Sequence, residues 1–180
     1  TISYTYRITP AVAAAVPQAD VRGLLNNPRV TAVELDEPVY AVDAELDNSW
    51  GVKRIGAGTV HNGGNYGLGV KIGIIDSGIN YTHSDLDGVY VGGYDFVAKD
   101  NDPMDVYGHG THVAGTACAE DNNIGVVGVA PNCALYSLRV LNDDGVGSWS
   151  SVIAAMDWAV KNSLQVANLS LGSSKNPGTA

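Results

Sequence analysis

The feature that most constrains the fold is the apolar run from Val70 to Ile75, which only Lys71 interrupts. A continuous apolar run of this length is typical of a central strand in a parallel sheet, buried on both faces. Asp76 ends the run, and Ser77 and Gly78 turn the chain. Open α/β sheets hold their sites at the carboxyl ends of their strands, so a functional carboxylate is one interpretation. An Asx turn is the simpler interpretation of an aspartate at that place.

Strand and helix patterns alternate after this run. Strands are expected at 134–141 and 166–172, and apolar residues at helical spacing predict a helix at 150–161. Such alternation implies βαβ units and a parallel sheet. The acidic loop-rich segment 81–105 lies between the first two strands. Most of its aspartates are expected to be solvated turn residues; the aspartates of the segment are Asp85, Asp87, Asp95, Asp100, Asp102 and Asp105.

The first 43 residues have a different pattern. Alternation predicts strands at 2–8 and 30–35, with a short helix between them that Asp20 would cap. Such a small α+β unit has too few residues to bury a strong core alone. Residues 37–49 are charged and unpatterned, which indicates an exposed connection. We therefore divide the chain into a unit at 1–43 and an α/β domain at 44–180.

Two histidines, His109 and His112, stand among glycines and small residues where a helix is expected to begin. An imidazole titrates near neutrality, so His109 at the open end of that helix is a candidate general base. An isolated histidine is more often a surface or core residue. A zinc site would need further ligands in a motif such as HExxH, which the sequence lacks.

Composition excludes several functions. The net charge of −9 argues against nucleic-acid binding, and no apolar run approaches the roughly 20 residues that span a bilayer. Two cysteines, Cys118 and Cys133, allow one disulfide or two free thiols.

Two motifs resemble the acid and base signatures of the subtilisin-like serine proteases in residues, order and separation: Asp76-Ser77-Gly78 and the stretch 108–115. The resemblance continues through 122–126, 128–131 and 170–172. It implies a parallel-sheet α/β catalytic domain that hydrolyses peptide bonds with an Asp-His-Ser triad. Asp76 would orient His109, which would activate the serine. His112 would have a structural hydrogen-bonding role.

The same resemblance implies that 1–43 is the later part of a ferredoxin-like propeptide, which packs on the enzyme and leaves its tail in the substrate cleft until cleavage, here between Tyr40 and Asp47. A substrate would lie extended between two strand edges. These edges are Gly145, Val146 and Gly147 on one side and Ser170, Leu171 and Gly172 on the other. Trp149 and Leu171 would line an apolar pocket, although Trp149 could instead begin a helix and cover the core.

A structural calcium ion is also implied by the resemblance. Asp85 and Asn122 would bind it through side-chain oxygens, and Ile124 and Val126 through backbone carbonyls. The family's further amide ligand has no clear match in residues 46–48. A secreted, extracellular protein is implied as well, which favours a disulfide between the cysteines.

The nucleophile motif of the family, Gly-Thr-Ser-Met-Ala, does not occur in this sequence. The chain is therefore interpreted as a protease precursor cut before its catalytic serine, and we expect it to be inactive alone. The alternative is a non-catalytic protein that binds peptides or inhibits a protease.

Overall fold

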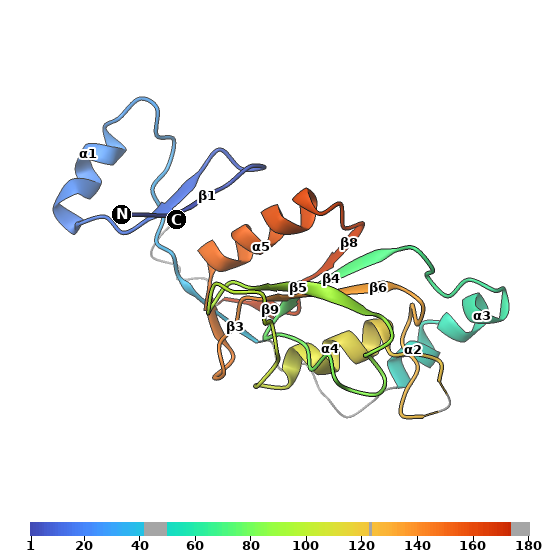
Figure 1. The fold of residues 1–180 in the computed structure, drawn as a ribbon. Coiled ribbons are helices and arrows are strands. Elements are labelled where there is room, and N and C mark those ends of the chain that lie inside the picture. The colour runs from blue at the N-terminus through green and yellow to red at the C-terminus, as the bar shows by residue number, and fades with distance from the viewer. Residues whose placement is uncertain (42–49, 123, 174–180) are drawn as a thin grey trace.

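The computed structural model describes residues 1–41, 50–122 and 124–173. A four-stranded parallel sheet in the order β5-β6-β4-β8 lies at its centre (Figure 1). Its strands are β4 (Lys71–Asp76), β5 (Tyr90–Asp95), β6 (Ala134–Arg139) and β8 (Val166–Asn168). The predicted α/β architecture with a parallel sheet is confirmed.

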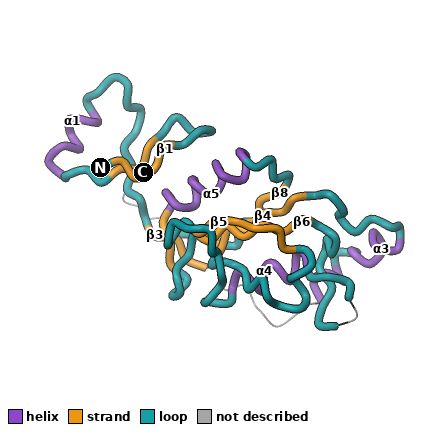
Figure 2. The backbone as a smooth tube through the Cα atoms, in the orientation of Figure 1, coloured by secondary structure: helices purple, strands orange, loops and turns teal. Residues whose placement is uncertain are grey.

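Two helices cover opposite faces of this sheet, α4 (His109–Cys118) and α5 (Trp149–Lys161) (Figures 1 and 2). Successive side chains of β4 point to opposite faces. Ile74 accordingly packs in the cluster that contains Ala114 of α4, and Ile75 packs in the cluster that contains Val152 of α5. Both isoleucines are fully buried. Each contributes about 1.5–3 kcal/mol of hydrophobic stabilisation, which fixes the sheet between the helices.

A smaller antiparallel sheet has the order β7-β3-β9. It consists of β7 (Val146–Ser148), β3 (Pro38–Ala41) and β9 (Leu171–Gly172). The single strand predicted at 166–172 is therefore two strands in two sheets. Residues 37–49 were expected to form an exposed connection, but they include the strand β3. This strand forms because β7 and β9 pair with its backbone on both sides.

The N-terminal residues form a hairpin of β1 (Ile2–Thr5) and β2 (Val12–Ala14), followed by η1 (Gln18–Asp20) and α1 (Val21–Leu25). The strand predicted at 30–35 is wrong: these residues are irregular, and Leu35 is 76% exposed. Asp20 precedes α1 but makes no side-chain cap. No residue between 1 and 37 is buried, so this part depends on contacts with the larger domain.

The N-terminal part meets α5 through polar contacts. The Asp36 carboxylate accepts the Ser150 N–H at 2.7 Å, at the start of α5. Further along the helix, Asp157 accepts the backbone N–H groups of Arg7 and Ile8. The Tyr6 hydroxyl donates to the Ser150 carbonyl at 3.3 Å.

Two short helices, α2 (Trp50–Arg54) and α3 (Ala57–Asn62), precede β4. Cys118 and Cys133 are free, buried thiols, in contrast to the expected disulfide. A hydrogen bond with Cys133, together with burial, raises the pKa of the Cys118 thiol. No helix among the described residues has the length and hydropathy needed to cross a bilayer.

Candidate active site

Asp76 and His109 meet at the carboxyl edge of the parallel sheet. Asp76 is the last residue of β4, and His109 is the first residue of α4. The His109 Nδ1 atom lies 2.8 Å from Asp76 Oδ1. With Asp76 ionised, Nδ1 is the donor, so the proton of a neutral imidazole is held on Nδ1 and Nε2 is the basic nitrogen. This arrangement fixes the tautomer that a general base needs.

The pair is shielded from solvent. The Asp76 side chain is fully buried and the His109 side chain is 10% exposed. Burial raises the pKa of Asp76 above its ordinary value of 3.8, while the hydrogen bonds from His109 and from the Ser77 N–H act in the opposite direction. Among the described residues, Asp76 Oδ2 has no hydrogen-bond partner. The ionised carboxylate is thus kept at a cost in folding free energy.

We expect Asp76→Asn to stabilise the fold at pH 8. The pKa of Asp76 is higher in the folded chain than in the unfolded chain, so the folded chain keeps the proton to a higher pH. The free energy of unfolding therefore falls as the pH rises from the unfolded pKa through the folded pKa. The amide avoids that loss. Urea unfolding should show Asp76→Asn to be more stable than the native chain at pH 8, with a smaller difference at pH 4. Asp102→Asn, in an exposed loop, is the control, and a destabilised Asp76→Asn at pH 8 would contradict the expectation.

A close backbone approach holds α4 against the turn after β4. A Cβ on Gly110 would lie 2.2 Å from the Gly78 carbonyl oxygen and 3.1 Å from Asp76 Cβ. The Gly110 N–H donates to Ser77 Oγ at 2.9 Å. Only glycine fits this position, and the contact brings His109 within reach of Asp76. His112, by contrast, is exposed and has no side-chain hydrogen bond in the described part of the chain, so its expected hydrogen-bonding role is not seen.

The two predicted substrate edges lie on either side of β3. Tyr40 of β3 is opposite Val146 of β7 and also opposite Gly172 of β9. Val39 is opposite Gly147, and Ala41 is opposite Leu171. The gap between the edges is therefore one strand wide, and the chain's own residues 38–41 fill it in the antiparallel orientation.

Side chains at the two edges differ in their environment. Leu171 packs against the core cluster beneath α5. Trp149 is the first residue of α5, which agrees with the interpretation that it begins a helix. Its side chain remains 38% exposed, however, so it does not cover the core. Gly145 has a φ of +74°, and a Cβ there would lie 2.7 Å from the Tyr107 ring. The Tyr107 ring, just before α4, thus lies against Gly145, just before β7. The sequence pattern did not reveal this contact.

The expected calcium ligands are close together. Asp85 is 4% exposed, and its Oδ2 accepts the Val126 N–H at 3.0 Å. Asn122 Oδ1 accepts the Ile124 N–H at 3.1 Å. Carboxylate, amide and carbonyl oxygens are the ligands that Ca²⁺ prefers. No group of three or more His, Cys, Asp or Glu side chains suited to a metal occurs in the described ranges, so any ion here would depend on carbonyls and water.

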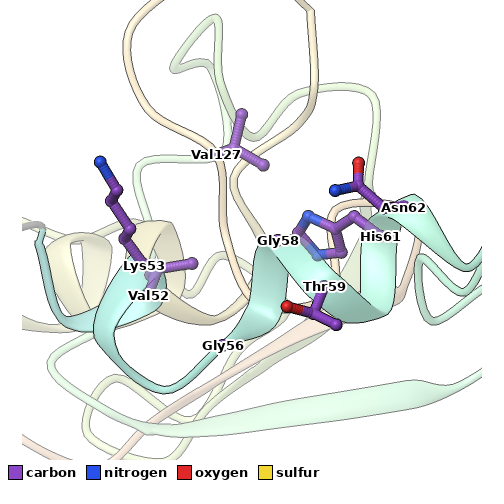
Figure 3. A pocket seen from close by; sticks show the side chains of 8 residues that line it. All are labelled: Val52, Lys53, Gly56, Gly58, Thr59, His61, Asn62 and Val127. Atoms are coloured by element: carbon purple, nitrogen blue, oxygen red, sulfur yellow. The ribbon is translucent and has the colours of Figure 1, made fainter.

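Two hollows lie near the start of the domain. One of about 450 Å³ lies over α2 and α3, where His61 and Lys53 contribute to its lining (Figure 3). The His61 Nε2 atom lies 2.9 Å from the Val129 carbonyl oxygen. The other hollow, of about 310 Å³, is lined by Asp85 and His112 and extends along α4. Neither hollow is lined by Asp76 or His109.

Two acidic residues were misjudged from the sequence. Asp95 is 1% exposed and pairs with Arg139, where a solvated turn residue was expected. Asp105 is half-buried and accepts hydrogen bonds from Ser77 and from the first turn of α4. A signal for Asp105 exists in the sequence: α4 has glycine at its N-cap, and a glycine cannot supply a capping side chain.

Comparisons with known proteins show which proteins the chain is similar to. The subtilase family matches residues 67–180. The chain is 41% identical over 170 residues to an alkaline protease of Alkalihalobacillus alcalophilus and 39% identical over 168 residues to Subtilisin E of Bacillus subtilis (strain 168). These alignments cover 94% and 93% of the chain but only 43% of each relative. A cold-adapted subtilisin-like serine proteinase matches with a TM-score of 0.56 and 42% identity, over 62% of this chain and 40% of that one.

Proposed function

Because the chain belongs to the subtilase family, we propose that it is the part of a subtilisin-like serine endopeptidase precursor that carries the acid and the base of an Asp-His-Ser triad. The Nδ1–Oδ1 contact of 2.8 Å between His109 and buried Asp76 carries this proposal. The chain spans less than half the length of the relatives it matches, and the Gly-Thr-Ser-Met-Ala motif is not in its sequence. We expect no peptide hydrolysis from these 180 residues alone.

The residues would act in the following way. His109 Nε2 accepts the proton of the serine hydroxyl as the hydroxyl attacks the peptide carbonyl, and later gives it to the leaving amine. Asp76 holds the ring through Nδ1 and stabilises the imidazolium. The buried position of Asp76 strengthens that interaction, because solvent screening is weak there.

The coding sequence downstream of Ala180 tests the proposal. We expect it to continue into a Gly-Thr-Ser-Met-Ala segment. A stop codon directly after Ala180 in the natural gene would contradict it and favour the non-catalytic alternative, in which the cleft only binds peptides. We also propose that the protein is secreted, on the basis of its family.

We further propose that residues 1–43 are a propeptide that occupies its own substrate cleft. The support is the position of β3 between β7 and β9, together with the contacts of Asp36 and Asp157 at α5. A protein substrate would take the place of β3 as an extended strand. Trp149 and Leu171 at the edges then favour substrates with apolar side chains.

We expect Tyr40→Pro to open the cleft. Tyr40 is opposite a residue in each neighbouring strand, and a proline has no N–H to donate within this sheet. A fluorescent peptide with the sequence of residues 34–44 should bind this variant and not the native chain, as measured by anisotropy. Leu35→Pro, in the exposed irregular segment, is the matched control and should bind no peptide. Equal binding by the native chain would contradict self-occupancy.

A calcium site at Asp85, Asn122, Ile124 and Val126 is proposed as a structural element. At a free Ca²⁺ concentration of about 100 times Kd, such an ion would add about 2.7 kcal/mol to the free energy of unfolding. Thermal unfolding should therefore shift to lower temperature on addition of EDTA. Asp85→Asn should abolish the shift, and Asp87→Asn, two residues away and exposed, should retain it. A native chain indifferent to EDTA and calcium would refute the site.

A further inference from the structure

The Asp105 carboxylate joins the two segments that carry the acid–base pair. Its Oδ1 accepts the Ser77 hydroxyl and the Gly108 N–H, each at 2.9 Å. Its Oδ2 accepts the Thr111 N–H at 2.9 Å and also the Thr111 hydroxyl. Ser77 directly follows Asp76, while Gly108 and Thr111 flank His109. Both oxygens of one side chain are thus used to connect the acid turn with the base helix.

Asp105 also completes the N-terminus of α4. Gly108 occupies the N-cap with a φ of 98° and has no side chain to accept an N–H. Asp105 accepts the N–H of Thr111 in the first turn from three residues upstream of that glycine. Its negative charge is favourable at a helix N-terminus and opposes the dipole field that disfavours a cation on His109.

The Ser77 hydroxyl is the link between these contacts. It donates to Asp105 Oδ1 and accepts the Gly110 N–H at 2.9 Å. The turn after β4 is therefore fixed to α4 on both sides of His109. The Nδ1–Oδ1 bond between His109 and Asp76 depends on how the turn after β4 is placed relative to the first turn of α4.

We propose that Asp105 is a positioning residue for the general base: through Ser77 and the first turn of α4 it holds the His109 imidazole against Asp76. This inference rests on the proposed function for the identity of the base. It adds a second acidic residue to the site, and this residue touches neither the substrate nor the reacting atoms.

The test is proton NMR of the 180-residue chain, which needs no serine nucleophile. The Nδ1 proton shared by His109 and Asp76 should give a resolved downfield resonance, identified by its absence in His109→Ala. Asp105→Ala should lose this resonance through exchange with water, while core methyl resonances stay in place. Asp102→Asn, whose native carboxylate accepts the Tyr81 hydroxyl in an exposed loop, should retain it.

Ser77→Ala keeps the proposal testable if Asp105→Ala does not fold. This variant retains the helix cap at Thr111 and removes both contacts of the Ser77 hydroxyl, with Asp105 and with the Gly110 N–H, so the Nδ1 resonance should again be lost. A native-like resonance in either folded variant would overturn the proposal and leave Asp105 as a local helix cap. Failure of the peptidase proposal would show instead in the downstream coding sequence, which does not affect this resonance.

Discussion

Gly110→Ala should destabilise the chain and separate His109 from Asp76. The added Cβ would lie 2.2 Å from the Gly78 carbonyl oxygen, which is backbone and cannot move aside as a side chain end can. Overpacking of this kind costs about 1–3 kcal/mol or more. The gain in helix propensity offsets about 1 kcal/mol at most. Since α4 can relieve the contact only by moving away from the turn, the Nδ1–Oδ1 bond should lengthen and the downfield resonance should disappear.

Gly115→Ala is the matched control on the same helix. A Cβ there would have no neighbour within 4 Å, so the substitution should be neutral or should stabilise α4 by about 0.5–1 kcal/mol. Urea unfolding of both variants measures the contrast. Equal stabilities for the two variants would show that the close approach at Gly110 does not constrain the site.

Asp95→Asn should have a comparably large effect at the same edge of the sheet. Asp95 is 1% exposed and pairs with Arg139, which is opposite Asp76 in the β4–β6 register. Removal of Asp95 leaves a largely buried guanidinium without its buried counter-charge, at a cost of about 3–5 kcal/mol. The loss should appear as a lower denaturant midpoint.

Asp143→Asn makes the same chemical change on the other side of Arg139. Asp143 is 63% exposed and lies 2.6 Å from Arg139 Nη2. Exposed pairs contribute little, so the change should stay within about 0.5 kcal/mol. If Asp143→Asn costs as much as Asp95→Asn, burial is not what makes the Asp95 pair important.

Three strands of the central sheet could be predicted from local patterns, but β5 lies in the segment 81–105 that was expected to be loop-rich. The roles of Asp76 and His109 were implied by the family resemblance of their motifs and not by the local pattern alone. The run 70–75 can be satisfied only by burial on both faces, and Asp76 follows it directly. Residues 30–35 and 38–41 show the opposite case. The first segment alternates like a strand but finds no partner, whereas the second contains proline and charged neighbours yet pairs with β7 and β9.

The contact between Asp105 and Ser77 could not be predicted from local pattern for a related reason. The importance of Asp105 comes from Ser77, which is distant in sequence and meets it only after β4 and α4 have packed together. An aspartate among many in an acidic loop looks solvated until that contact exists. Side-chain contacts between segments are therefore the part of the site that local patterns miss.

The central claim is that Asp76 and His109 are the acid and base of a serine endopeptidase. It is tested most directly by joining this chain to the remaining, serine-bearing part of Subtilisin E and measuring peptide hydrolysis by the folded chimera. We expect hydrolysis, and we expect His109→Ala in the chimera to lower its rate at least about 1,000-fold. A folded His109→Ala chimera that hydrolyses the peptide as fast as its parent would contradict the claim.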